Sequence, residues 1–127
     1  MKLNDFLAAL ETLAPHDLAL SWDNVGLLVG PDHDEVKHVL VALDCTSVTA
    51  REAVEVGADL LLTHHPVFFE AVRRFLPNDP ALAGAYILAR HGIGHVAAHT
   101  NLDAAPGGVN DALAKALNIQ NTLPFGE

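Results

Sequence analysis

The segment Leu60-Leu61-Leu62-Thr63-His64-His65-Pro66 decides the fold, because an apolar run of strand length stops at two adjacent histidines. Two other apolar runs end in the same way: Val39–Leu43 is followed by Asp44, and Ile93–Ala98 is followed by His99. A short continuous apolar run is typical of a strand inside a sheet, and Val39–Leu43 is interpreted as a strand buried on both faces. The three runs therefore predict three strands, each with a polar side chain at its carboxyl end.

Helices are predicted between these strands. The signals are apolar faces with helical spacing, capping residues at the start, and glycine or proline just beyond the end. The predicted helices cover residues 4–13, 47–56, 80–92 and 109–117. Strands that alternate with helices are joined by right-handed crossovers, which predicts an α/β fold with a largely parallel sheet flanked by helices. The length of 127 residues suits one such domain, covering residues 1–127.

The composition places the chain among globular proteins and argues against two kinds of partner. Half of the residues are hydrophobic and 18% are charged, which is not the composition of a disordered protein. The formal charge of −9, from 16 acidic and 7 basic residues, disfavours nucleic acid, since phosphate contacts need clustered Lys and Arg. No apolar run approaches the roughly 18 residues of a membrane span, and the first residues do not resemble a signal peptide. With its single cysteine, the chain is expected to be cytoplasmic.

The polar residues that follow the three strands predict a functional site. Carboxyl ends of parallel strands meet at one edge of the sheet, where open α/β folds bind ligands. Asp44, the pair His64-His65 and the segment His99–Asp103 should therefore converge. Imidazole and carboxylate groups are ligands of zinc, iron and manganese. Consecutive side chains of a strand point to opposite faces, so the adjacent histidines suit a two-ion site with one histidine on each ion.

Each of these residues also has an interpretation without a metal. His64 and His65 could bond backbone groups at the strand end, and Asp103 could be a turn or helix-capping residue. His99 could be a ligand, a group that orients a ligand, or a proton shuttle. Asp44 is expected to be structural or to orient a ligand. The other five histidines are expected at the surface: His16, His33, His38, His91 and His95.

Other chemistries have weaker support in the sequence. The chain has no P-loop, no Gly-x-Gly-x-x-Gly and no Gly-x-Ser-x-Gly pattern. Cys45 follows a strand without a histidine base at a recognisable spacing, so nucleophilic catalysis is a poor fit. Asp23 and Asn24 lie in a Trp-Asp-Asn-Val-Gly turn, where they could bind a ligand or satisfy backbone donors of the turn itself.

Three motifs that together span most of the chain are Ser21–Gly30, Leu62–Phe69, and His99–Asp103 followed by Gly107–Asp111. In order and spacing they resemble the amino-terminal half of the NGG-interacting-factor-three family, whose members are often labelled GTP cyclohydrolase I type 2 homologues. The resemblance implies a dinuclear centre of two divalent ions, zinc, iron or manganese, with His64, His65 and Asp103 as ligands. It also implies a toroidal, commonly hexameric, homo-oligomer.

Members of that family continue beyond the position of Glu127 and supply a further histidine and a glutamate, four residues apart. The chain ends at Phe125-Gly126-Glu127 before any such segment, so we expect either a fragment of a longer protein or a half-length version. Three protein ligands would then serve two ions, which predicts reduced metal affinity and little hydrolase activity. The expected partners are further copies of the chain and a nucleotide or other small-molecule substrate.

Three functions remain open from the sequence. The first is a metal-dependent hydrolase. In its GTP cyclohydrolase version, hydroxide attacks the imidazole carbon of the purine and formate leaves, with His99 as the catalytic residue that donates or relays protons. Arg73 and Arg74 could then meet the triphosphate. The second is a non-catalytic oligomeric metal-binding scaffold or regulatory interaction protein, and the third is a structural α/β domain with incidental histidines.

Overall fold

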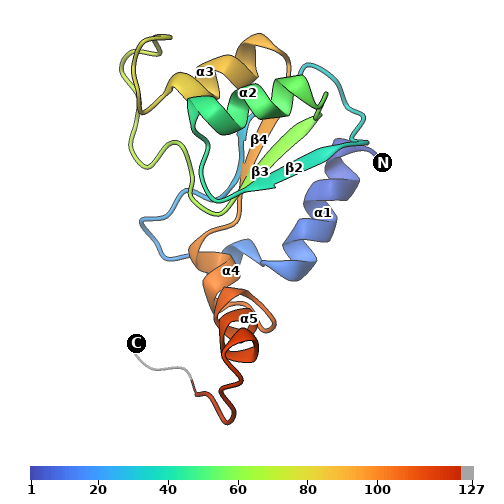
Figure 1. Cartoon of the computed structure of the whole chain (residues 1–127), viewed down its shortest axis with the longest axis vertical. Helices are drawn as coiled ribbons and strands as arrows, with labels where there is room; N and C mark the ends of the chain where they lie inside the picture. The colour runs from blue at the N-terminus through green and yellow to red at the C-terminus, as the bar shows by residue number, and fades with distance from the viewer. Residues whose placement is uncertain (124–127) are drawn as a thin grey trace.

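The computed structural model describes residues 1–123, which form a sheet with helices on both faces (Figure 1). The strands are β1 (Gly26–Val29), β2 (Val39–Ala42), β3 (Leu60–Thr63) and β4 (Gly94–Ala97). They lie in the order β1-β4-β3-β2, with β2, β3 and β4 parallel and β1 antiparallel to β4. The predicted α/β fold is confirmed as a mixed, mostly parallel sheet. Its antiparallel edge strand was not foreseen.

The helices follow the predicted order with two differences. They are α1 (Leu3–Leu13), the 3₁₀ turn η1 (His16–Leu18), α2 (Ser47–Glu55), α3 (Ala83–Arg90), α4 (Thr100–Ala104) and α5 (Val109–Ala116). Helix α3 begins about one turn later than expected, because the Asp79 carboxylate accepts a hydrogen bond from the backbone of Ala81 and closes a separate turn. The five-residue helix α4 was not predicted, and it carries Asp103.

The core is divided by the sheet, and side chains of the central strand β3 alternate between its two halves. Leu60 faces α1 together with Val96, and Leu61 faces α2 and α3, where it lies in one cluster with Leu88 of α3. All four are completely buried. Burial of such a side chain stabilises the fold by about 1.5–3 kcal/mol, so β3 is held firmly from both sides. This packing on both faces also holds the carboxyl end of β3 in place.

The prediction that the Val39–Leu43 strand is buried on both faces is wrong. Strand β2 lies at the edge of the sheet, and Val41 is 69% exposed. Leu40 and Ala42 pack against the α2 and α3 side, and Val39 packs on the α1 side. The four residues of α1 that pack on the sheet, Leu3, Phe6, Leu7 and Leu10, contact the cluster around Leu60 and Val96 and leave Val41 uncovered.

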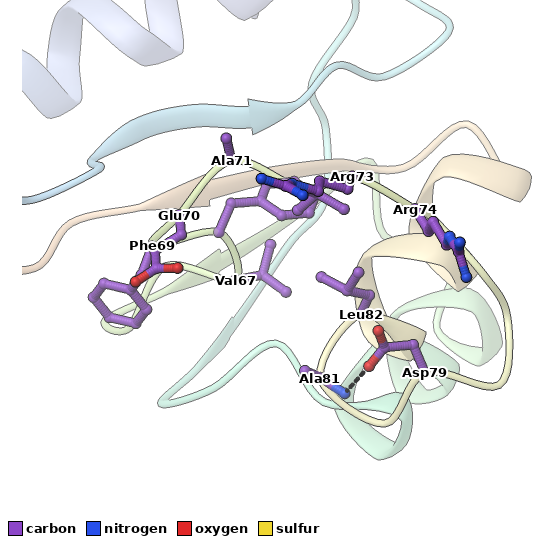
Figure 2. Close-up of a pocket in the computed structure, with 11 residues that line it drawn as sticks. Val67, Phe69, Glu70, Ala71, Arg73, Arg74, Asp79, Ala81 and Leu82 are labelled. Atoms are coloured by element: carbon purple, nitrogen blue, oxygen red, sulfur yellow. Dashed lines mark hydrogen bonds between the residues drawn. The ribbon is translucent and has the colours of Figure 1, made fainter.

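Two parts of the chain lie apart from this core. Helix α5 extends away from the sheet, and its predicted apolar face, with Val109, Leu113 and Leu117, is exposed (Figure 1). Residues 64–82, between β3 and α3, form no helix or strand, and part of this segment lines a hollow of about 660 Å³ (Figure 2). None of the helices within residues 1–123 combines the length and the apolar character required to cross a membrane.

Candidate metal centre

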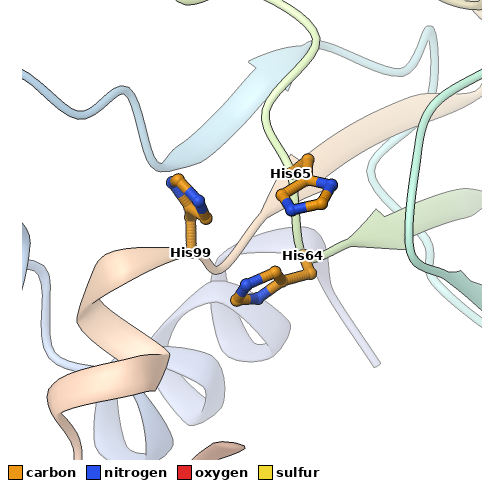
Figure 3. Close-up of side chains that lie close together, drawn as sticks. All are labelled: His64, His65 and His99. Atoms are coloured by element: carbon orange, nitrogen blue, oxygen red, sulfur yellow. The ribbon is translucent and has the colours of Figure 1, made fainter.

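Three imidazole rings meet where β3 and β4 end (Figure 3). His64 and His65 follow β3 directly, and His99 lies two residues beyond β4. The ring centroids are 5.0 Å apart for His64 and His65, 5.0 Å for His64 and His99, and 5.5 Å for His65 and His99. One potential ligand atom of each ring lies within 4.8 Å of the other two.

Adjacent histidines reach one cluster because the strand has already ended. Strand β3 stops at Thr63, whose hydroxyl donates a hydrogen bond of 2.7 Å to the carbonyl oxygen of His65. The chain therefore turns at His64, and the alternation of side chains along a strand no longer applies. The expectation of one histidine for each of two ions was based on that alternation, so the geometry of the turn removes its physical basis.

The Nδ1 atom of every ring in the cluster has an oxygen acceptor on the outer side. His64 Nδ1 lies 3.1 Å from the carbonyl oxygen of Ala98, and His65 Nδ1 lies 2.7 Å from the Asp44 carboxylate. His99 Nδ1 lies 3.0 Å from Oδ1 of Asp23. A carbonyl or carboxylate oxygen only accepts, so each Nδ1 carries the proton. In the neutral imidazoles, each Nε2 then carries a free lone pair.

The Asp23 carboxylate is the best-bonded of these outer acceptors. Its side chain is fully buried, and it accepts hydrogen bonds from His99, from the backbone N–H groups of Asn24 and Thr100, and from the Thr100 hydroxyl. Burial raises the pKa of this carboxyl, but the hydrogen bonds from Thr100 and His99 outweigh burial and lower it to about 2. Asp23 therefore satisfies backbone donors of the turn, as one interpretation of the sequence proposed. Its ionised carboxylate also orients His99 through a hydrogen bond.

Asp103 lies beside the histidines. One of its carboxylate oxygens is 3.7 Å from His64 Nε2, which is too long for a hydrogen bond. Two atoms that each lie about 2.1 Å from one zinc ion are at most about 4.2 Å apart, so this separation suits two ligands of a shared ion. The structure thus brings His64 and Asp103 together as predicted. The assignment of Asp103 as a ligand and of His99 as the catalytic residue stays a prediction.

Two residues near the cluster, Cys45 and His95, do not belong to it. Burial raises the pKa of the Cys45 thiol to about 12, so a thiolate nucleophile is disfavoured here. His95, expected at the surface, is completely buried in β4 and lies 2.8 Å from the Thr63 hydroxyl. It pairs with Leu61 in the register of β3 and β4, on the side of α2 and α3, which the sequence alone could not show.

The motifs and the cluster can now be compared with known proteins. Residues 1–127 match the family described as Duf34/NIF3 (NGG1p interacting factor 3). The chain belongs to this family. It is 43% identical over 121 residues to a protein named GTP cyclohydrolase 1 type 2 homolog from Staphylococcus aureus (strain COL). It is 42% identical over 124 residues to a protein of the same name from Clostridium perfringens (strain 13 / Type A).

Solved structures of family members share the fold. A Bacillus cereus protein related to NIF3 matches with a TM-score of 0.89 and 36% identity, over 95% of this chain and 33% of that chain. Reduced HcgD from Methanocaldococcus jannaschii matches with a TM-score of 0.86 and 38% identity, over 98% of this chain and 50% of that chain. The two curated relatives are matched over 95% and 97% of this chain but only 33% and 47% of their own lengths. The chain thus spans a third to a half of the relatives it matches.

Proposed function

We propose that this chain binds divalent metal ions through the histidine cluster and that the bound metal serves hydrolysis of a nucleotide. The observation that carries the proposal is the orientation of the three rings, each with Nδ1 bonded outward. Metal-binding histidines almost always donate their second ring N–H to a carboxylate or carbonyl, which fixes the tautomer and the orientation of the ring. His64, His65 and His99 all have such a partner.

The donor set fits the metals that the family resemblance implies. Imidazole nitrogens and a carboxylate oxygen together suit zinc, iron or manganese, and no thiolate or all-oxygen cage is present among these residues. On the family resemblance, and not on strand alternation, this proposal assigns His64, His65 and Asp103 as the side chains that hold two divalent ions. His99 has its Nδ1 proton fixed by Asp23, so its Nε2 is free to accept a proton from water or substrate and to return it.

A bound divalent ion would lower the pKa of water and polarise an electrophilic carbon, which is the chemistry that hydrolysis needs. The relatives named GTP cyclohydrolase 1 type 2 homolog suggest GTP as the substrate to test. The cluster supports a hydrolase further because Asp23 stays ionised at any physiological pH and fixes the orientation of the His99 ring. Release of formate from GTP is therefore the activity to test, and three protein ligands for two ions predict a low rate for this chain.

Calorimetric titration with zinc tests the metal site, and formate release from GTP tests the reaction. His64→Gln should weaken zinc binding at least tenfold, whereas His91→Gln, which changes an exposed histidine outside the cluster, should bind as the wild type does. His99→Gln should retain zinc and lose turnover. Equal zinc affinity of His64→Gln and wild type would refute the site, and loss of zinc from His99→Gln would make His99 a ligand rather than a proton carrier.

A second function is favoured by the surface of α5. Its exposed apolar residues, which include Leu113 and Leu117, suit contact with another copy of the chain, as the hexamer implied by the family resemblance requires. A metal-binding scaffold that assembles without turning over GTP is therefore the alternative. Light scattering measures the assembly, and a chain that binds zinc and self-associates but releases no formate would favour the scaffold.

A further inference from the structure

Two aromatic side chains outside the proposed metal ligands contact His99. The Trp22 ring centroid lies 6.1 Å from that of His99 with an interplanar angle of 71°, and the Phe69 centroid lies 5.8 Å away at 78°. They come from separate segments, one before β1 and one after β3. Both are unusually open to solvent for large aromatic residues, with Trp22 58% exposed and Phe69 52% exposed.

Neither ring is explained by packing within the chain. Phe75, in the same segment as Phe69, packs against Phe68 at 6.3 Å and Tyr86 at 5.4 Å. By contrast, within residues 1–123 the one aromatic ring found against Phe69 is His99, and the same holds for Trp22. The indole N–H of Trp22 has no hydrogen-bond partner in that described part of the chain, so its polar edge is free as well.

The two rings are nevertheless held in place. Asp23, next to Trp22, is bonded to His99 and Thr100. Asn24 donates a 2.6 Å hydrogen bond from its side chain to the carbonyl oxygen of Phe68, the neighbour of Phe69. The segment that carries Trp22 is thus bonded directly to the segment that carries Phe69. Rings whose backbones are fixed in advance lose little entropy when a ligand binds against them.

We infer that Trp22 and Phe69 form an aromatic binding surface beside His99 for the flat heteroaromatic ring of a ligand, a purine base in the proposed reaction. Stacking on aromatic side chains depends on the π-face of a base and requires no charge. A neutral ring suits this place, because the carboxylates of Asp23, Asp44 and Asp103 surround the histidines and repel anions. The inference deepens the proposed function and rests on it for the choice of a purine.

The hollow next to Phe69 has room for the rest of such a ligand. Its volume of about 660 Å³ lies within the usual range for small-molecule sites. Phe69 lies at one side of the hollow, and Arg73 and Arg74 line other parts of it (Figure 2). Neither arginine forms an ion pair within residues 1–123, so both are available to phosphate groups. Glu70 and Asp79 also line the hollow, so a phosphorylated tail would have to contact the two arginines directly.

Trp22 is the one tryptophan of the chain, so its fluorescence reports directly on this surface. Guanosine is titrated into the 127-residue chain with zinc and, separately, with a chelator, under excitation at the red edge of the indole band. We expect saturable quenching in both conditions. Phe69→Leu should weaken guanosine binding about tenfold, within the range of one lost stacking contact. Phe75→Leu, a matched change in the same segment, should bind guanosine as the wild type does.

The inference would be overturned by no saturable quenching, by equal binding of guanosine by Phe69→Leu and wild type, or by equal quenching with ribose 5-phosphate, which lacks a base. Trp22 emission that depends on protein concentration, with no response to guanosine, would show that another copy covers the surface and would also overturn it. Because guanosine binding is read without metal, it can hold when zinc binding fails. Zinc binding can likewise hold when guanosine does not bind, so the two proposals fail separately.

Discussion

Replacing His95 with leucine should remove an acid-sensitive step from the stability of the fold. His95 is 0% exposed, and its Nε2 lies 2.8 Å from the hydroxyl of Thr63. That hydroxyl donates its hydrogen to the carbonyl oxygen of His65, so it accepts from His95, and Nε2 carries the proton. His95 Nδ1 is then a buried acceptor, and it has no partner within residues 1–123. Burial lowers the pKa of His95 from its ordinary value of 6.5 to about 4.

The sign of the pH effect follows from these two values. Between pH 6.5 and 4 the unfolded chain binds a proton at His95 and the folded chain does not, so stability falls as the pH falls. At about 1.36 kcal/mol per pH unit, the loss reaches about 2 kcal/mol at pH 5 and about 3 kcal/mol below pH 4. Leucine cannot take up a proton. It removes the unpaired acceptor but also the hydrogen bond to the Thr63 hydroxyl, so at pH 7.5 the stability of the variant should lie within about 1 kcal/mol of that of the wild type.

Urea unfolding at pH 7.5, 6 and 5, with a chelator present throughout, measures this difference. The free energy of unfolding of the wild type should fall by about 2 kcal/mol more than that of His95→Leu between pH 7.5 and 5. His38→Leu is the matched control, because His38 is exposed and its side chain forms no hydrogen bond within residues 1–123. If wild type and His95→Leu lost the same stability over this range, the argument from burial of His95 would be refuted.

Further predictions concern packing at Gly84, the hydrogen bond between Asp23 and His99, and the pH dependence of zinc binding. Gly84→Ala should destabilise the fold by about 1–3 kcal/mol in urea, because the added Cβ would lie 2.5 Å from the carbonyl oxygen of Cys45. Asp23→Asn should lower the free energy of unfolding by about 2 kcal/mol at pH 7. The difference from the wild type should shrink as the pH falls from 3.8 towards 2, because the depressed pKa of Asp23 stabilises the fold fully only above pH 3.8. The same variant should retain zinc in calorimetry but lower formate release 10–100-fold, since His99 loses the charged partner that fixes its tautomer. Zinc affinity of the wild type should fall sharply between pH 7.5 and 5, because imidazoles must be neutral to bind a metal, and equal affinity at both pH values would exclude the histidines as ligands.

Prediction of the fold from the sequence succeeded for strands that are completely buried and failed for strands that are partly exposed. The run Leu60–Thr63 is apolar because β3 is central and covered on both faces, and the prediction is confirmed. The run Val39–Leu43 looks the same in sequence, yet β2 lies at the edge and Val41 is exposed. Hydrophobicity alone does not give the order of strands in a sheet, because that order depends on the side of the preceding strand on which each crossover places the next one. The antiparallel pairing of β1 was hidden for the same reason.

The histidines of the site were visible in the sequence because strand ends are local features, whereas the groups that orient them are distant. Asp23 is separated from His99 by 76 positions, and Asp44 from His65 by 21. Asp44 was expected at the same edge because it also follows a strand, whereas nothing in the sequence pairs Asp23 with His99. The Trp-Asp-Asn-Val-Gly turn was recognised as a possible binding element, but the partner of its carboxylate could be found only from the fold. The burial of His95 was missed because a polar residue near the start of a predicted strand is ordinarily expected at the surface.

The turn after Thr63 connects these observations. The Thr63 hydroxyl accepts from His95 and donates to the carbonyl oxygen of His65, so the buried layer under α2 and α3 is bonded directly to the segment that presents the histidines. This bond bends the chain where β3 ends, and the rings of His64 and His65 consequently reach the same cluster. Strand alternation would have separated them onto two faces. We therefore expect Thr63→Val, which removes this hydroxyl, to change the ratio of zinc to chain measured by calorimetry, and an unchanged ratio would show that the turn does not depend on it.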